Sequence, residues 1–309
     1  MHAHLMRRQG ISREQLARHR IAVVAEKVIP DGPLIRRLGN RLGVERDARP
    51  GEMRRSFEVQ FERLRAAVEQ QALPRIDSPA ALDKALQDGT PAVVLSSEGA
   101  DFLEGDLGYL ERMRAAGLVH LQLVHYRISD VGDISTEEPK HGGLTAFGKD
   151  VVRACNRLGI LVDVAHCTTA GIEQAIELSA KPLIYSHGHV LDRPPVAALG
   201  GIAARAIHLP LAKRMAEKGG VVGLWPLGAQ YANRRVYAEA LLRTAEAVGG
   251  PMHVGIGSDL NGLPSTVLPT HEEFAEVADI LAKHGLSETQ VEGIMGGNYV
   301  RVLRQAMTL

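Results

Sequence analysis

Short apolar segments rich in β-branched residues alternate along this chain with longer amphipathic segments. The segments typical of strands are Ile21–Ile29, Ala92–Ser97, Val119–Val124, Ile160–Ala165, Pro182–Ser186, Val221–Trp225 and His253–Ser258, and the opening MHAHLM is the stub of an eighth. Near-continuous apolar strands indicate a parallel sheet that is buried on both faces. The segments with helical spacing of apolar residues are Leu107–Ala116, Thr145–Leu158, Thr168–Ser179, Leu209–Lys218, Tyr237–Ala247 and Glu272–His284. This alternation predicts an α/β fold, specifically a (β/α)8 TIM-type barrel.

Two further segments are predicted to be additions to the regular barrel. Glu52–Ala72 is predicted to be a long helix inserted after the second strand. Asp130–Gly143 is polar and rich in glycine, which indicates a loop over the mouth of the barrel. A length of 309 residues is normal for one such barrel, so we expect a single domain over residues 1–309.

Composition narrows the class of function. Lysine plus arginine and aspartate plus glutamate number 36 each, so the chain lacks the net charge that attracts nucleic acid or an anionic membrane. No apolar run reaches the roughly 18 residues that a membrane span needs. No signal peptide is apparent, which favours the cytoplasm, although a leader could have preceded this numbering. Cys155 and Cys167 make no disulfide framework and are expected to be buried apolar residues.

Side chains that bind metals fall where the predicted strands end. In a barrel of this type, functional residues lie on the loops that follow the C-terminal ends of the strands. The residues in question are His2 and His4 in the first strand, Glu98 after the third, His125 after the fourth, His166 after the fifth, His187 after the sixth and Asp259 after the eighth. Five histidines instead scatter over helices and loops, where we expect ordinary surface residues: His19, His141, His208, His271 and His284.

The first two strand ends suggest how ions could be held. His2 and His4 are two residues apart, so on a strand they face the same side and can bind one ion. Glu98 could bridge two cations with its two carboxylate oxygens. The structural alternatives are a frayed terminus for the histidine pair and a carboxylate near a helix dipole for Glu98.

The later strand ends add further candidates. His166 and His187 follow consecutive strands, and either one alone would be interpreted as a buried ring with satisfied hydrogen bonds. Asp259, in HVGIGSDLNG, needs a partner that a cation would supply, although a turn is the alternative. Asp163 is expected to pack near the site or to support a ligand, and Cys167 to point away from His166. The combination of these residues favours a metal centre over the separate structural interpretations.

With these residues in place, the chain resembles the membrane (renal) dipeptidase family of zinc peptidases, which belongs to the amidohydrolase-like superfamily. The resemblance runs from Ala92 to the C-terminus and more faintly over the start of the chain. It is carried by SSEGADFLEGDLGYLERMRAAGLVHLQLVHY, GGLTAFGKDVVRACNRLGILVDVAH, KPLIYSH, AEKGGVVGLW, HVGIGSDLNG and GIMGGNYVRVL.

The resemblance implies a barrel with two divalent ions, Zn²⁺, that hydrolyses dipeptides through a metal-bridging hydroxide. Glu98 matches the bridging glutamate, and His166 and His187 match two ligands of one zinc. Asp259 matches the aspartate at the other zinc, which also handles the proton. The family further implies a homodimer.

Two substrate-binding roles also follow from the resemblance. His125 matches a histidine that contacts the substrate and the tetrahedral intermediate. Arg205 matches the arginine that binds the substrate carboxylate, with Arg193 as a competitor because the stretch after His187 is longer than in the family.

One departure from the family pattern leaves the reaction open. His4 stands where the family has an aspartate, since the first strand reads Met-His-Ala-His, and this removes a negative charge from the site. This change and the lengthened loop Leu191–Ala204 keep another amidohydrolase reaction possible, such as lactone or acyl-amino-acid hydrolysis. A non-catalytic barrel with a weakened metal site is the alternative from another class. A phosphotriesterase-type site is disfavoured because it needs a bridging lysine at the fourth strand, where this chain has His125.

Overall fold

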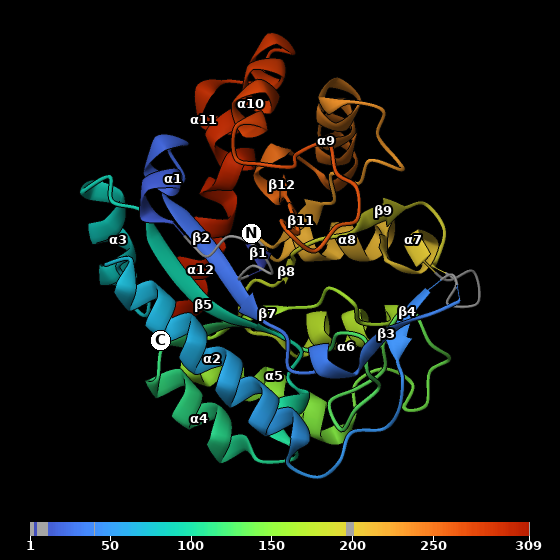
Figure 1. Ribbon diagram of the computed structural model, residues 1–309. Coiled ribbons are helices and arrows are strands. Elements are labelled where there is room, and N and C mark those ends of the chain that lie inside the picture. Colours follow the sequence, from blue (N-terminus) through green and yellow to red (C-terminus); the bar gives the residue numbers. More distant parts are fainter. Residues whose placement is uncertain (1–2, 5–11, 40, 196–200, 309) are drawn as a thin grey trace.

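The computed structural model describes residues 3–4, 12–39, 41–195 and 201–308, with 3–4 described by their backbone. Within these residues, eight parallel strands form one curled sheet in chain order. They are β1 (Ala3–His4), β2 (Val23–Val28), β5 (Ala92–Glu98), β6 (Leu118–Gln122), β7 (Leu161–Asp163), β8 (Ile184–Tyr185), β11 (Val221–Leu224) and β12 (Val254–Ile256). Helices surround this sheet (Figure 1). The predicted α/β barrel class is therefore confirmed, although no ladder joins β12 to β1 among the residues described.

The helices that follow the strands largely coincide with the predicted segments. They are α4 (Leu107–Ala115), α5 (Ala146–Leu158), α6 (Thr169–Leu178), α8 (Leu209–Glu217), α9 (Arg234–Val248), α10 (Glu273–Lys283), α11 (Glu288–Glu292) and α12 (Asn298–Met307). Side chains at the N-caps fix several starts, because Thr145, Thr168 and Asn233 each accept a hydrogen bond from the backbone of the first turn. Gly159 and Gly249 end α5 and α9 in the left-handed conformation that glycine adopts easily.

The insertion after β2 is larger than the sequence predicted. The expected long helix is α2 (Glu52–Gln70). A two-stranded antiparallel hairpin, β3 (Ile35–Leu38) and β4 (Arg41–Val44), precedes it, and α3 (Pro79–Gln87) follows it. The short helix α1 (Arg13–Arg18) lies between β1 and β2. The segment Leu191–Ala204, expected as a loop, begins with the last residue of β9 (His189–Leu191) and ends in α7 (Gly201–Ala204). β9 pairs in parallel with β10 (Ala206–His208).

Strand alternation divides the core into two parts. Val93 and Leu95 of β5 point outward into the large apolar cluster beneath the helices. Ala92 and Val94 point the other way, into a smaller cluster that α12 closes with Tyr299 and Val302. Ser96 and Glu98 continue this second face toward the C-terminal end of the strand, so the interior of the sheet changes from apolar to polar along its length.

None of the helices in the described part of the chain has both the length and the apolar character that a bilayer span requires.

Candidate metal centre

Glu98, His166 and His187 come together at the C-terminal end of the sheet. Glu98 is the last residue of β5, and the two histidines follow β7 and β8. Glu98 Oε1 lies 3.3 Å from His166 Nε2 and 3.4 Å from His187 Nε2. The two Nε2 atoms are 3.2 Å apart, and all three side chains are buried. Two imidazole nitrogens and a carboxylate oxygen converging at this spacing form a ligand set that suits Zn²⁺.

Hydrogen bonds fix the orientation of both imidazoles. His166 Nδ1 lies 3.0 Å from the carbonyl oxygen of His125, and a carbonyl can only accept, so Nδ1 carries the proton and Nε2 presents a lone pair to the cluster. His187 Nδ1 contacts Ser186 Oγ at 2.8 Å, which leaves its Nε2 directed at the same point. Burial and the charge of Arg205 lower the pKa of His166 well below its usual value. His166 is therefore a neutral imidazole at neutral pH, the form that binds a metal ion.

His125 is held beside the cluster by a residue that the sequence interpretation missed. Asp31 follows β2, is buried, and lies with its Oδ1 2.7 Å from His125 Nδ1. Its Oδ2 accepts a hydrogen bond from the backbone N–H of Tyr126 at 2.9 Å. Burial lowers the pKa of His125, but the charges of Asp31 and Glu98 outweigh it and raise the pKa above the usual value. Asp31 therefore orients His125 with its Nε2 3.5 Å from Glu98 Oε1.

Arg205 is the basic residue that reaches the cluster. Its side chain is buried, its Nη2 lies 2.9 Å from His187 Nε2, and its guanidinium stacks on the ring of Trp225 at 4.5 Å. Trp225 also donates from Nε1 to Asp259 Oδ2 at 3.1 Å. Arg193, the competing candidate, is exposed. The structure thus brings Arg205 and Asp259 into one cavity with Glu98 and His166.

His166 and Asp259, at this end of the sheet, have left-handed backbone conformations. His166 has a φ of 68° and Asp259 a φ of 44°. Residues other than glycine seldom adopt this conformation, and such strain concentrates at functional sites. Both residues follow strands by three positions, so the turn redirects each side chain toward the cavity.

Beneath the cluster lies a layer of buried polar side chains. Lys27 Nζ is 2.5 Å from Asp163 Oδ2 and 2.9 Å from Gln122 Oε1, and Lys27 and Asp163 have no exposed side-chain surface. Two strands separate β2 from β7 in the sheet, so this ion pair crosses the interior of the curl. Asp163 Oδ1 accepts the backbone N–H groups of Ala165 and Ser186, which directly precede His166 and His187. Asp163 therefore stabilises, by hydrogen bonds, the backbone that leads into both histidines.

The remaining predicted residues are placed as follows. His2 lies outside the described residues, and His4 is described by its backbone alone, which pairs with Lys27 of β2. Cys155 and Cys167 are buried and free, as expected, and burial raises the pKa of both thiols. The segment Asp130–Gly143 is irregular, as predicted, and the Asp133 carboxylate accepts backbone hydrogen bonds from Lys140, His141 and Gly143.

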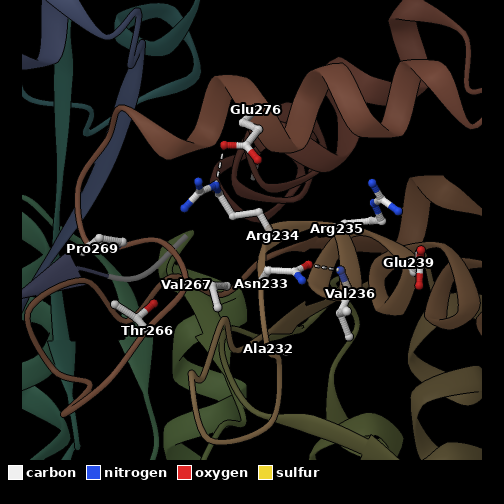
Figure 2. Close-up of a pocket in the computed structure, with 10 residues that line it drawn as sticks. All are labelled: Ala232, Asn233, Arg234, Arg235, Val236, Glu239, Thr266, Val267, Pro269 and Glu276. Carbon is white, nitrogen blue, oxygen red and sulfur yellow. Dashed lines mark hydrogen bonds and ion pairs between the residues drawn. The ribbon is translucent and has the colours of Figure 1, made fainter.

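A second cavity, of about 880 Å³, lies apart from this centre at the start of α9. Figure 2 shows Arg234 directed toward Glu276 and Asn233 toward the backbone of Val236. The Arg234–Glu276 ion pair and the Asn233 N-cap occupy part of this lining, and the lining includes no histidine or cysteine. This cavity therefore offers no comparable ligand set.

Comparison with curated proteins finds dipeptidases among the relatives of this chain. The chain is 29% identical over 236 residues to the dipeptidase tcpJ of Claviceps purpurea, covering 71% of this chain and 52% of that protein. It spans about half the length of the curated relatives that it matches.

Solved structures share the fold. An amidohydrolase from Pseudomonas aeruginosa superimposes with a TM-score of 0.78 at 22% identity, covering 100% of this chain and 95% of the other. A metallo peptidase from Rhodobacter sphaeroides, solved with a phosphinate mimic of the dipeptide L-Ala-D-Ala, gives a TM-score of 0.78 at 19% identity, covering 97% and 92%. The model of the membrane dipeptidase family, peptidase family M19, matches residues 42–309. The chain therefore belongs to the membrane dipeptidase family.

Proposed function

We propose that this protein is a metal-dependent dipeptidase with two divalent ions, Zn²⁺, at the end of the sheet. The observation that carries the proposal is the buried Glu98–His166–His187 cluster, which shares one cavity with Arg205 in a chain of this family. The curated relatives are named dipeptidases, and the Rhodobacter sphaeroides structure binds a dipeptide mimic. We assign the ions to His2, His4, Glu98, His166, His187 and Asp259, with Glu98 shared between them.

The ions, when bound, supply Lewis acidity that makes water a nucleophile near neutral pH and polarises the peptide carbonyl. Arg205 binds the carboxylate of the dipeptide through its planar guanidinium. In the structure this group donates to His187 Nε2, whose single lone pair takes one partner at a time. In the metal-loaded protein the guanidinium is therefore available to the substrate.

His125 and Asp259 handle charge and protons. His125, whose Nδ1 donates to Asp31, presents an N–H at Nε2 to the cavity in its protonated form, and this N–H stabilises the negative charge that develops on the carbonyl oxygen. Asp259 accepts a proton from the attacking water and delivers it to the leaving amine. Trp225 holds the Asp259 carboxylate in place by donating from Nε1 to Oδ2.

Metal analysis followed by a substrate panel tests the proposal. We expect about two ions per chain and cleavage of L,L or L,D dipeptides in preference to lactones and acyl-amino acids. Glu98→Gln and Asp259→Asn are expected to abolish hydrolysis while the circular dichroism spectrum stays unchanged. Glu69→Gln, at an exposed position on α2, is the matched control and should retain activity. A metal-free chain, or undiminished hydrolysis by the Glu98→Gln variant, would contradict the assignment.

We also propose that residues 1–309 fold as one domain and that the chain forms a homodimer. Light scattering coupled to size-exclusion chromatography measures the oligomer directly, and a monomeric mass would contradict the second part.

A further inference from the structure

The cavity that contains the metal cluster extends well beyond it. Its volume is about 1330 Å³, above the roughly 300–1,000 Å³ of most small-molecule sites. The floor is formed by the site residues, and the outer wall by the β3–β4 hairpin and one face of α2. A dipeptide of small residues leaves much of this space unfilled. The outer wall is therefore placed to contact whatever side chain the substrate carries.

Arginines dominate that outer wall. Those that line it are Arg36, Arg37, Arg41, Arg49, Arg55 and Arg63. The lining carboxylates are Glu98 and Asp259 at the floor and Glu52 on the wall. Glu52 is bound by the guanidinium of Arg46, and this hydrogen bond is the main reason that its pKa is lowered to about 2. Glu52 is thus already neutralised by an arginine that does not line the cavity.

Two of these arginines have no acidic partner among the described residues. Arg36 pairs with Glu45 and Arg41 with Glu137. By contrast, no described carboxylate lies within ion-pair distance of Arg55 or Arg63, and both are exposed. The chain as a whole has equal numbers of acidic and basic residues, so the excess positive charge on this wall of the cavity is a local feature.

The pattern on α2 places these charges together. Arg55, Val59 and Arg63 are spaced four residues apart, so they share one face of the helix. Val59 is 52% exposed between them, which leaves an apolar contact flanked by two guanidinium groups. Solvated arginines are common on helices, but these line the same cavity as Glu98 and His166. A ligand at the cluster that extends outward therefore meets them.

We propose that this arginine wall binds an anionic side chain of the substrate, so that acidic dipeptides are preferred over neutral ones. This inference rests on the proposed function. Arginine is suited to the task because its planar fork binds carboxylate or phosphate through two hydrogen bonds. The charges also attract anionic peptides from a distance, and salt weakens this attraction.

A panel of matched dipeptides tests the inference. Ala–Glu and Ala–Gln differ by charge at nearly constant shape, Glu–Ala and Gln–Ala place the same pair at the other end, and Ala–phosphoserine distinguishes phosphate from carboxylate. We expect kcat/KM for the better glutamate peptide to exceed that of its glutamine partner about tenfold, equivalent to 1.4 kcal/mol. The advantage should lie in KM and shrink at high salt.

Variants assign the effect to the wall. The double variant Arg55→Gln/Arg63→Gln should reduce the glutamate-to-glutamine ratio of kcat/KM to near one. The control is Arg153→Gln/Arg243→Gln, which removes the same charge from exposed positions on α5 and α9 that do not line the cavity, and it should keep the wild-type ratio.

The outcomes separate this inference from the proposed function. Cleavage of neutral and acidic peptides with equal kcat/KM would overturn the inference and leave the dipeptidase proposal intact. If no peptide is cleaved, the dipeptidase proposal fails, and calorimetric binding of the same peptides to the metal-loaded protein decides the inference. Tighter binding of the glutamate peptides, lost in Arg55→Gln/Arg63→Gln, supports it, and equal binding overturns it.

Discussion

The Lys27–Asp163 ion pair beneath the metal centre yields a quantitative prediction. Lys27→Met removes the ammonium group while keeping an unbranched side chain of similar length. The change leaves the Asp163 carboxylate with no solvent exposure and without the Nζ atom that lies 2.5 Å away. Breaking a buried pair by removing one partner costs about 3–5 kcal/mol. We expect a loss of this size in the free energy of unfolding near neutral pH.

The pKa of Asp163 gives the pH dependence of this loss. Burial raises the pKa of Asp163, but the Lys27 charge and the hydrogen bond from His120 outweigh it and hold the pKa well below its usual value. A carboxyl group with a depressed pKa stabilises the fold above its unfolded pKa, and this contribution is lost as the pH falls through its folded pKa. The Lys27→Met variant lacks most of this contribution, so its stability should change less between neutral and acidic pH than that of the wild type.

The same variant should weaken metal binding, because the ion pair supports the backbone of the proposed ligands His166 and His187. Asp163 Oδ1 holds the N–H groups just before His166 and His187 at 3.0 Å each. Gln122, the other partner of Lys27, donates to the carbonyl of Val124 at 2.8 Å. Loss of groups that orient metal ligands typically lowers metal affinity about 10–100-fold. Competition with a chromophoric zinc chelator measures this affinity independently of activity.

A double-mutant cycle distinguishes the ion pair from a general loss of packing. In Lys27→Met/Asp163→Asn neither charge remains, and the asparagine oxygen can still accept the two backbone hydrogen bonds. Urea denaturation should therefore show that the double variant is more stable than Lys27→Met alone. Lys84→Met is the control, since Lys84 forms an exposed pair with Asp88, and it should change stability by less than about 1 kcal/mol. Additive losses in the cycle, or a loss below about 1 kcal/mol for Lys27→Met, would refute the reasoning.

Three further predictions follow from other buried groups. Burial, together with the charge of Asp31, raises the pKa of Asp101 to about 7, so ionisation of this carboxyl group destabilises the fold as the pH rises from the unfolded pKa through 7. Thermal denaturation should therefore show that Asp101→Asn is more stable than the wild type at pH 8, by at most about 4 kcal/mol, and no more stable at pH 4. Gly148→Ala should destabilise the protein by about 1–3 kcal/mol or more in urea denaturation, because an added Cβ would lie 1.9 Å from the carbonyl oxygen of Val131. Asp31→Asn should lower kcat about 10–100-fold with little change in metal content, because it loosens the orientation of His125; an unchanged kcat would argue against this role.

The sequence could predict that Glu98, His166 and His187 meet, because a barrel brings the ends of successive strands to one rim. Glu98, His166 and His187 are far apart in the chain, yet each comes at the end of an apolar strand. Parallel strands in chain order carry those ends to the same rim, so the three side chains meet. The roles of His2 and His4 stay predictions, because their side chains lie outside the described part of the chain.

Other parts could not be predicted, for reasons that lie in long-range contacts. Asp31, in IPDG, has the local pattern of a turn aspartate, and its partner His125 is 94 positions away. The β3–β4 hairpin has short strands rich in arginine, so it lacks the apolar alternation that identifies a strand. Lys27 did indicate a buried polar contact, because a lysine within an apolar strand requires a buried partner, but the sequence does not identify that partner.

The polar layer around Lys27 and Asp163 is an unusual feature of this barrel. Barrel interiors are normally filled by branched apolar side chains, and here that filling stops at residues such as Ala25 and Val94. Above them the interior holds the Lys27–Asp163 ion pair. Because removing two charges from water is costly, such a pair stabilises the fold no more than an apolar pair of equal volume would. An apolar replacement could not accept the N–H groups of Ala165 and Ser186, and the turns bearing His166 and His187 would lose their anchor. The charges are therefore best explained as supports for the proposed metal ligands, which predicts that a well-packed apolar pair at positions 27 and 163 keeps the fold and loses metal binding.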